Sequence, residues 1–355
     1  MKVGLIGCGG IANIHMGAYK RIKDVEVVAV CDLNIERAKI LAKKFGVRRV
    51  FDDYVSMVES EKLDLVDVCT PVSTHAKIVI DVSEVVPAVF VEKPMALSVQ
   101  ECDEIIGAIK RHGAKLCIGH NQLFLPTVQK AKSLVDSGSF DLLSFRTVVK
   151  EDYEFLKAHG WLAPWAVTPE QKGVLWESCC HLAYLHLHFL PNIVEVYAVG
   201  NKVKYPVYDD FAVLLKTADG RFGIIELSWL SKETEISYEL RDKTGRRIEI
   251  YRDYDYFVEK TEKPPYNVWH VLRHIFVDEN RILKKWVKYG IRYFKKGKIL
   301  PTYLLLRGFI ESIEKDSPPP VLPEDGKKTI ALLEAIEKSL DRSKPAIFNP
   351  KPVAN

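Results

Sequence analysis

The first 120 residues alternate continuous apolar runs with amphipathic stretches. Apolar runs rich in β-branched residues are typical of strands buried on both faces of a parallel sheet. They predict strands near 2–6, 25–31, 64–69, 88–91 and 115–119. The amphipathic stretches predict helices near 11–21, 34–45, 52–59, 74–84 and 98–111. This alternation predicts an α/β fold with a doubly wound parallel sheet and a ligand site at the carboxyl ends of its strands.

Later in the chain the pattern changes to shorter apolar runs separated by turns. A helix is predicted at 128–136, a strand at 140–149 and a second helix at 174–190. The following runs, separated by glycine-containing turns, are typical of strands joined by hairpins. These runs lie at 193–199, 210–216, 222–229, 235–240 and 246–250. A chain of 355 residues exceeds one typical domain, and we expect two, at 1–121 and 122–355.

A glycine-containing turn follows the first predicted strand. Gly7, Gly9 and Ala12 form the pattern G-x-G-x-x-A, and the second apolar run ends in Asp32. Gly7 permits a tight turn, Gly9 lets the backbone approach a pyrophosphate, and Ala12 lets the helix pack closely on the strand. The alternative is an ordinary strand-to-helix turn. Because helix N-terminal N–H groups bind phosphates, the spacing favours a dinucleotide site. Its residues would be Gly7, Gly9, Gly10, Ile11, Ala12 and Asp32.

The acid after the second strand bears on the choice of cofactor. The Asp32 carboxylate would accept hydrogen bonds from an adenosine ribose diol and would repel a 2′-phosphate. Leu33 and Asn34 beside it offer no cation, and Arg37 lies some way into the next helix. We therefore expect NAD rather than NADP.

Two further strand ends carry polar residues next to proline. The first loop is either a strand stop with a helix cap or a loop over the nicotinamide end of the cofactor. The second places an acid and a lysine directly after a buried strand. It is either a solvated loop or a site of proton transfer, because burial can lower the pKa of a lysine toward neutrality. The candidate residues in these loops are Thr70, Pro71, His75, Glu92 and Lys93.

Composition and charge argue against several classes of protein. The net charge of +4 is small for 355 residues, which argues against a dedicated nucleic-acid-binding surface. The first residues lack a signal-peptide pattern, and the longest uncharged run, 178–194, contains three histidines, so no membrane span is expected. Seven scattered cysteines without C-x-x-C spacing favour reduced thiols in a cytoplasmic protein. No metal site is expected, because no paired ligand spacing is present.

Several short sequence blocks, taken together, are specific enough to indicate a family. The order GCGGIANIH, CDLN, CTPVSTH, VEKPMAL and GHNQLFLP resembles the Gfo/Idh/MocA family of NAD(P)-dependent oxidoreductases. The segments 173–185 and 309–340 resemble that family's histidine helix and its closing segment. The resemblance implies a Rossmann domain followed by an α/β domain with a large, mostly antiparallel open sheet. It also implies a sugar, inositol or nucleotide-sugar substrate, and a homodimer or homotetramer formed through that sheet.

The resemblance also singles out a catalytic group. Lys93 is similar to the family's active-site lysine and His181 to its proton-transfer histidine, while Glu177 stands where many members have aspartate. Glu177 and His181 are four residues apart on one predicted helix, so both would project from the same face. Two departures put the substrate in doubt. Tyr184 occupies a position where the family often has aspartate, and Cys179 and Cys180 replace small glycine-like residues.

The expected reaction is oxidation of a secondary alcohol. His181, together with Lys93, would take the hydroxyl proton while hydride leaves to the cofactor, and Lys93 would stabilise alkoxide charge. A polyhydroxylated small molecule would suit the site, although packing in the core or in a loop is the alternative for several of the residues. The candidate substrate contacts are Lys93, His120, Asn121, Tyr153, Trp161, Glu177 and His181.

Two alternative functions remain open at the level of sequence, and one segment has more than one interpretation. The chain could be an NAD-binding regulatory protein without turnover, or an enzyme that oxidises and then reduces its substrate with one retained cofactor.

The segment 281–298 carries eight cations and no acid. It is either a helix docked on the sheet with a solvated basic face, a cover for an anionic substrate, or a contact with an acidic membrane surface.

Overall fold

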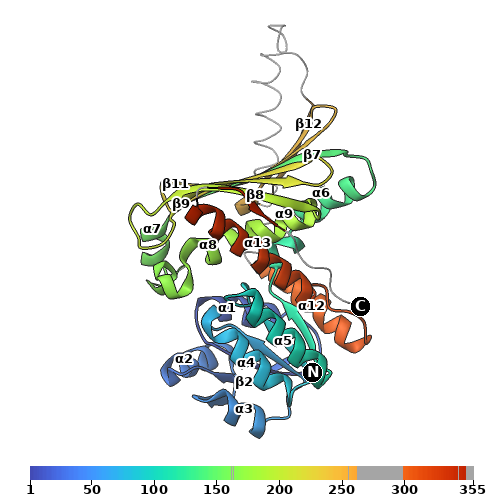
Figure 1. The fold of residues 1–355 in the computed structure, drawn as a ribbon. Helices are drawn as coiled ribbons and strands as arrows, with labels where there is room; N and C mark the ends of the chain where they lie inside the picture. Colours follow the sequence, from blue (N-terminus) through green and yellow to red (C-terminus); the bar gives the residue numbers. More distant parts are fainter. Residues whose placement is uncertain (161, 163, 255, 262–298, 343, 349–355) are drawn as a thin grey trace.

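The structure, a computed structural model, describes residues 1–348 except 161, 163, 255, 262–298 and 343. Trp161 and the basic segment 281–298 therefore lie outside the described residues. Figure 1 shows an α/β layer built from the N-terminal part of the chain and a second layer with a broad sheet. None of the described helices is long and apolar enough to cross a membrane.

The first sheet is parallel throughout and has the strand order β3-β2-β1-β4-β5-β6. Its strands are β1 (Lys2–Ile6), β2 (Glu26–Cys31), β3 (Arg49–Phe51), β4 (Leu65–Val68), β5 (Ala88–Val91) and β6 (Lys115–Ile118). The helices between them are α1 (Gly10–Tyr19), α2 (Ile35–Phe45), α3 (Tyr54–Ser60), α4 (His75–Ser83) and α5 (Val99–His112). The predicted doubly wound sheet is confirmed. The strand β3 was not predicted, because it is only three residues long and lies at the sheet edge.

The strand order reverses between β1 and β4. Chain connections leave in opposite directions from these two neighbours, which opens a crevice at their carboxyl ends. The glycine turn follows β1, and the Thr70 loop follows β4. The fold therefore brings two of the sequence-predicted loops to the place where ligands bind in open α/β sheets.

The second sheet is mostly antiparallel, with the order β13-β12-β11-β7-β10-β9-β8-β14. Its strands are β7 (Leu142–Asp152), β8 (Ile193–Asn201), β9 (Asp210–Thr217), β10 (Phe222–Ser228), β11 (Leu230–Asp242), β12 (Arg246–Tyr251), β13 (Tyr256–Thr261) and β14 (Ala346–Ile347). Only the β7–β10 pair is parallel among the described strands. Alternating exposure along β8 and β9 shows that one face is packed and the other points outward. The expected large open sheet is confirmed.

Helices α6 (Pro126–Asp136), α7 (Tyr153–Ala158), α9 (Cys179–Phe189) and α13 (Pro323–Arg342) pack against strands of this sheet. Two further helices are α8 (Gly173–Glu177), which precedes α9, and α12 (Ile299–Glu314), which packs against α1. Figure 1 shows α13 running between the second sheet and the first layer, and α12 beside the first layer. Phe309 of α12 contacts Phe90 of β5 with ring centroids 6.2 Å apart. In α13, a Cβ at Gly326 would lie 2.7 Å from Met95 Sδ, so glycine permits this close approach.

The helix predicted at 174–190 is divided in two, which corrects the expectation of one continuous helix. Ser178 lies between α8 and α9. The His181 N–H donates to Ser178 O at 3.2 Å, an i→i−3 bond that tightens the chain at this point. Ser178 Oγ also accepts a hydrogen bond from Trp229 Nε1 at 3.2 Å. Glu177 and His181 therefore belong to different helices.

Candidate active site

The turn after β1 has the geometry that a dinucleotide needs. Gly7 has φ +93°, and a Cβ there would lie 2.6 Å from Cys69 O. A Cβ at Gly9 would meet no atom within 4 Å, so the space beside that backbone is open. Gly9 is also the N-cap of α1, and no side chain caps this helix. The first N–H groups of α1 thus have no side-chain partner and fit a pyrophosphate.

Asp32 is tied directly to the glycine turn. Its Oδ2 accepts a hydrogen bond from Cys8 N at 2.8 Å, and its Oδ1 accepts one from Asn34 N at 2.8 Å. Each carboxylate oxygen keeps a second lone pair for a ribose hydroxyl. The backbone bonds fix where the charge lies, which fits the ribose of NAD. Arg37 is exposed on α2.

His75 joins two of the loops. Its Nε2 lies 2.9 Å from Thr70 O, and its Nδ1 lies 2.8 Å from Pro94 O. The ring is buried, and burial lowers its pKa. Both nitrogens therefore face protein carbonyls, and His75 positions the Thr70 and Lys93 loops relative to each other instead of offering a free nitrogen. The cofactor contact expected at His75 stays a prediction.

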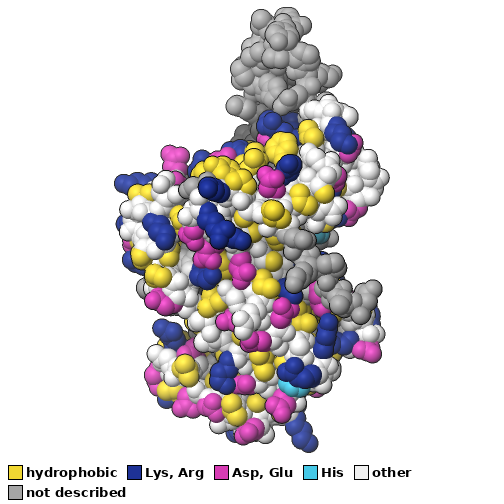
Figure 2. Space-filling model, in the orientation of Figure 1, with side chains coloured by type: hydrophobic (Ala, Val, Ile, Leu, Met, Phe, Trp, Pro, Cys, Tyr) yellow, Lys and Arg dark blue, Asp and Glu magenta, His cyan; other side chains and the backbone are white. Residues whose placement is uncertain are grey.

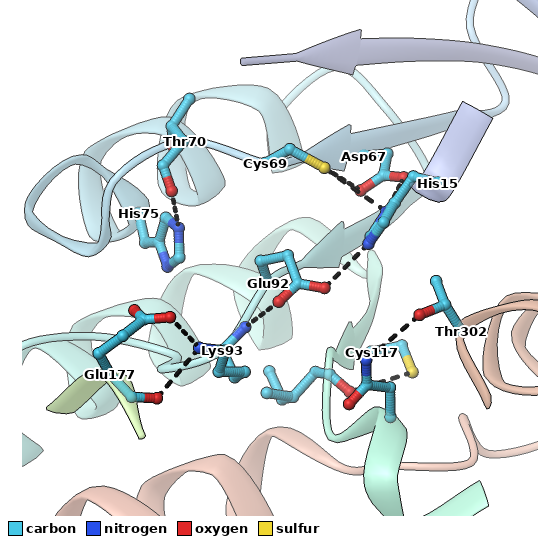
Figure 3. A network of polar contacts seen from close by, with 12 residues as sticks. His15, Asp67, Cys69, Thr70, His75, Glu92, Lys93, Cys117, Glu177 and Thr302 are labelled. Carbon is cyan, nitrogen blue, oxygen red and sulfur yellow. Dashed lines mark hydrogen bonds and ion pairs between the residues drawn. The ribbon is translucent and has the colours of Figure 1, made fainter. Parts of the chain in front are cut away.

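Lys93 reaches across from the first layer to the second. Its Nζ lies 2.8 Å from Glu177 Oε1 and donates to Glu177 O at 3.1 Å (Figure 3). The Lys93 side chain is 10% exposed and that of Glu177 is 28% exposed. Burial lowers the pKa of Lys93, but the charges of Glu177 and its acidic neighbours outweigh burial, and the net shift is upward. The expectation of a lysine pKa lowered toward neutrality is therefore wrong, and Lys93 is an ammonium with one hydrogen left for a ligand.

His181 has the opposite electrostatic environment. Burial lowers its pKa well below the usual value, and the positive charges of Lys93 and Arg252 lower it further. The ring is consequently neutral near pH 7. Its Nδ1 lies 2.7 Å from the Tyr184 hydroxyl. Lys93 contacts Glu177, four positions before His181, so the structure brings the lysine to the segment that carries His181 although 88 positions separate the two residues in the sequence.

The loop after β6 supplies two buried polar groups. His120 stacks on Tyr184 with ring centroids 4.2 Å apart, and burial lowers its pKa to about 3. Its Nε2 has no hydrogen-bond partner among the described residues. Asn121 Nδ2 donates to Thr302 Oγ1 at 3.2 Å, whereas its Oδ1 has no partner within the described chain. These two atoms are candidates for contacts with a polar ligand.

Tyr153 is placed differently from the expectation. It is 1% exposed and stacks on Trp229 with ring centroids 5.1 Å apart. This is the packing alternative considered for this residue, because a ring in the core cannot stack on a sugar.

A cavity of about 40 Å³ lies against the lysine–glutamate pair and is lined from both layers. Its lining residues are Thr70, Val72, Lys93, Pro94, Ala166, Gln171, Trp176 and Glu177.

A buried cluster behind the site was not predicted. His15 of α1 lies between two carboxylates, with its Nδ1 2.7 Å from Asp67 Oδ2 and its Nε2 2.9 Å from Glu92 Oε1 (Figure 3). Glu92 Oε2 in turn accepts a hydrogen bond from Lys93 N at 3.1 Å. Burial opposes charge on His15, but Asp67 and the neighbouring Cys69 outweigh it, so the pKa of His15 is raised well above its usual value. The result is a buried imidazolium that holds the acid preceding Lys93.

The sequence did contain a signal for this cluster. His15 shares the buried face of α1 with Ala12, Met16 and Tyr19, at helical spacing. A histidine on such a face needs buried partners. Asp67, an acid inside the apolar run of β4, is the corresponding signal on the sheet. Sequence alone does not indicate that these two residues meet.

Comparisons with known proteins agree with this geometry. Residues 1–120 match the model described as "Oxidoreductase family, NAD-binding Rossmann fold", and residues 128–253 match the Gfo/Idh/MocA C-terminal domain. A myo-inositol 2-dehydrogenase of Thermotoga maritima is 24% identical over 358 residues, covering 97% of each chain.

Two solved structures share the fold over almost the whole length. A WlbA dehydrogenase from Bordetella pertussis in complex with NADH and UDP-GlcNAcA has a TM-score of 0.82 at 21% identity, covering 98% of each chain. A levoglucosan dehydrogenase in complex with NADH has a TM-score of 0.81 at 18% identity, covering 98% of this chain and 99% of that chain. The glycine turn, the acid after β2 and the two matched domains together show that the chain belongs to the Gfo/Idh/MocA family and is an oxidoreductase with NAD as its cofactor.

Proposed function

We propose that this protein is an NAD-dependent dehydrogenase that interconverts a secondary alcohol and the corresponding ketone on a sugar, an inositol or a nucleotide sugar. The observation that carries the proposal is the ion pair that joins Lys93, in the loop after β5, to Glu177, four positions before the neutral His181. When bound, NAD supplies the hydride chemistry. The protein residues bind the substrate, orient its oxygen and handle the proton.

Each of the three residues has a distinct task. The Lys93 ammonium points one remaining N–H toward a ligand and stabilises negative charge on the substrate oxygen. Glu177 holds the ammonium in place with its carboxylate and its backbone carbonyl. His181 is neutral and hydrogen-bonded at Nδ1, and we assign the contact with the same oxygen to its Nε2. We propose these as the catalytic residues.

Two observations support a polyhydroxylated substrate. His120 Nε2 and Asn121 Oδ1 are buried without partners among the described residues, and hydroxyl groups both donate and accept hydrogen bonds. The relatives named above are dehydrogenases of myo-inositol and levoglucosan and one solved with a nucleotide sugar. A substrate rich in hydroxyl groups is the chemistry that these features have in common.

The test is an NADH absorbance assay across a panel of sugars, inositols and UDP-sugars. Turnover with at least one member is expected, and it should be lost in Lys93→Ala. Tight NAD binding without turnover for any member would instead support a regulatory protein on the same scaffold. Cofactor that co-purifies and survives dialysis would indicate a cycle with retained cofactor.

We also propose that the outward face of the second sheet pairs two copies of the chain. Tyr197, Val199 and Leu214 are 39%, 48% and 47% exposed on neighbouring strands β8 and β9. Figure 2 shows hydrophobic side chains gathered on the side of this sheet that faces away from the first layer. Such patches mark protein interfaces. Light scattering should show a dimer or tetramer for the wild type and a smaller species for Leu214→Glu.

A further inference from the structure

The Tyr184 hydroxyl has two hydrogen-bond partners in the described chain. It accepts a hydrogen bond from the backbone Gln122 N–H at 3.1 Å. It also lies 2.7 Å from His181 Nδ1. The ring is 2% exposed and stacks on His120, so the hydroxyl is held where it is. Tyr184 therefore connects the loop after β6 with the imidazole of the active site.

The position of one proton follows from these contacts. A backbone N–H can only donate, so Tyr184 Oη is the acceptor toward Gln122. The hydroxyl hydrogen then needs an acceptor of its own, and His181 Nδ1 is the one that the described residues place within reach. The nearby Gln122 Oε1 already accepts a hydrogen bond from the Tyr238 hydroxyl. If His181 carried its proton on Nδ1, the buried Tyr184 O–H would lose its acceptor.

We propose that Tyr184 holds neutral His181 in the tautomer with the proton on Nε2, so that His181 donates a hydrogen bond to the substrate oxygen and Lys93 alone transfers the proton. The catalytic part of this inference rests on the proposed dehydrogenase function. The assignment of the His181 tautomer does not depend on that function. His181 Nε2 has no hydrogen-bond partner among the described residues, so it is available to a ligand.

The proton balance of the site then fits reduction of a ketone. In the proposed site, the N–H groups of Lys93 Nζ and His181 Nε2 donate to one substrate oxygen, which gains negative charge as the carbonyl carbon receives hydride from NADH. The Lys93 N–H bond breaks, the proton goes to the substrate oxygen, and the lysine amine regains a proton from water. His181 keeps its proton throughout. In the oxidation direction the same oxygen must lose its proton to Lys93 after that ammonium has deprotonated.

Tyrosine at this position matters for the direction of the hydrogen bond. A carboxylate can only accept, and beside Nδ1 it would place the imidazole proton on Nδ1 and leave Nε2 as a base. A hydroxyl that is already an acceptor from Gln122 does the reverse. Tyr184 is accordingly a positioning residue that determines whether His181 acts as a donor or as a base.

The test is ¹⁵N NMR of the full-length protein labelled at histidine. The His181 signals are assigned by their absence in His181→Asn. The wild type should show a protonated Nε2 and an unprotonated Nδ1. In Tyr184→Phe the hydroxyl no longer constrains the ring, and the ratio of Nδ1–H to Nε2–H forms should rise by about tenfold. A wild-type His181 protonated at Nδ1, or an unchanged ratio in Tyr184→Phe, would overturn the proposal.

Tyr238→Phe is the matched control. It removes a buried hydroxyl that bonds the Gln122 side chain without touching His181, and it should leave the His181 tautomer unchanged. A tautomer shift of equal size in this control would assign the effect to general loosening and overturn the role of Tyr184. The NMR readout needs no substrate. Absence of turnover on every panel member would therefore refute the proposed function. The NMR result on the tautomer would be unaffected by that outcome.

Discussion

The first layer and the second layer each hold a histidine at the centre of a polar network, and only one of the two rings is charged. His15 lies between Asp67 and Glu92. Asp67 and Cys69 raise its pKa and keep it protonated. His181 lies near Lys93 and Arg252, and its pKa is lowered, so it is neutral. Burial disfavours the charged form of both rings. The neighbouring groups decide the outcome, because negative neighbours compensate an imidazolium for lost hydration and positive neighbours disfavour it further.

The difference also distinguishes a histidine with a structural role from a histidine that is available to a substrate. His15 is 0% exposed, and both of its nitrogens are used within the protein, so it can only hold Glu92 and the loop that follows. His181 uses one nitrogen within the described chain and is partly exposed. A protonated histidine in the core stabilises the frame, whereas a neutral histidine at the edge of the site remains available to a substrate.

The largest expected effect is on stability when His15 is removed. His15→Leu leaves the Asp67 and Glu92 carboxylates buried without a cation, which should lower the free energy of unfolding by about 3–5 kcal/mol. Urea unfolding followed by circular dichroism measures this change. Adding Glu92→Gln to the variant should recover part of the loss, since one buried charge is then removed. Equal stability of wild type and His15→Leu would show that the ring is not a needed counter-charge.

The next effect is on turnover. Lys93→Ala and His181→Ala should each reduce kcat at least about a hundredfold, because each removes a group that contacts the reacting oxygen. Steady-state kinetics with the substrate found in the panel measures this loss. His188→Ala, two turns further along α9, serves as a control and should keep near wild-type turnover. Either active-site variant retaining normal kcat would remove that residue from the mechanism.

The two histidines should also make the free energy of unfolding change with pH in opposite directions. The folded-state pKa of His181 lies below the unfolded value near 6.5, so below that pH only the unfolded chain binds the proton. Stability therefore falls as pH decreases, by about 1.4 kcal/mol per pH unit, and His181→Asn should remove this loss.

For His15 the sign is reversed. Its folded-state pKa is raised, so above pH 6.5 only the folded protein keeps the proton, until the pH passes the raised value. Its stabilising contribution is complete below pH 6.5 and is lost as pH rises through that window. His15→Gln should flatten the alkaline side of the curve and His181→Asn the acidic side. Urea unfolding at a series of pH values checks both, and parallel curves for both variants would contradict the assigned charges.

The smallest expected effect concerns the cofactor. Asp32→Ala removes the acceptor for the ribose diol and the repulsion of a 2′-phosphate, so NAD should bind about tenfold more weakly and NADP should gain relative to NAD. Fluorescence titration with both nucleotides measures the ratio. Because Asp32 also holds Cys8 N and Asn34 N, Asp32→Asn is the control that keeps the side-chain shape without the charge. An unchanged preference in both variants would refute the ribose contact.

Much of the fold could be predicted from the local pattern of apolar residues. The apolar runs at β1, β2, β4, β5 and β6 are strands in the structure, because a parallel strand covered on both faces must be apolar throughout. The family and its cofactor followed from short motifs and are confirmed. The roles of Lys93 and His181 stay predictions, and Trp161 and 281–298 lie outside the described residues.

Other features depended on contacts that no local pattern contains. Lys93 meets Glu177 across 84 positions, and His15 meets Glu92 across 77. These contacts reversed the expected direction of the Lys93 pKa and gave the two histidines different protonation states. The contact of Tyr184 with His181 is close in sequence, but its meaning depends on the Gln122 N–H that reaches it from another loop.

By itself, then, the order of amino acids determined which segments are buried, where the chain turns and which chemical groups stand at the strand ends, because these depend on neighbours within a few residues. The tertiary structure decided which of those groups are charged and which way each hydrogen bond points. The physical reason is that a buried ionisable group takes its protonation state from the partners packed against it, and the fold brings those partners from distant parts of the chain.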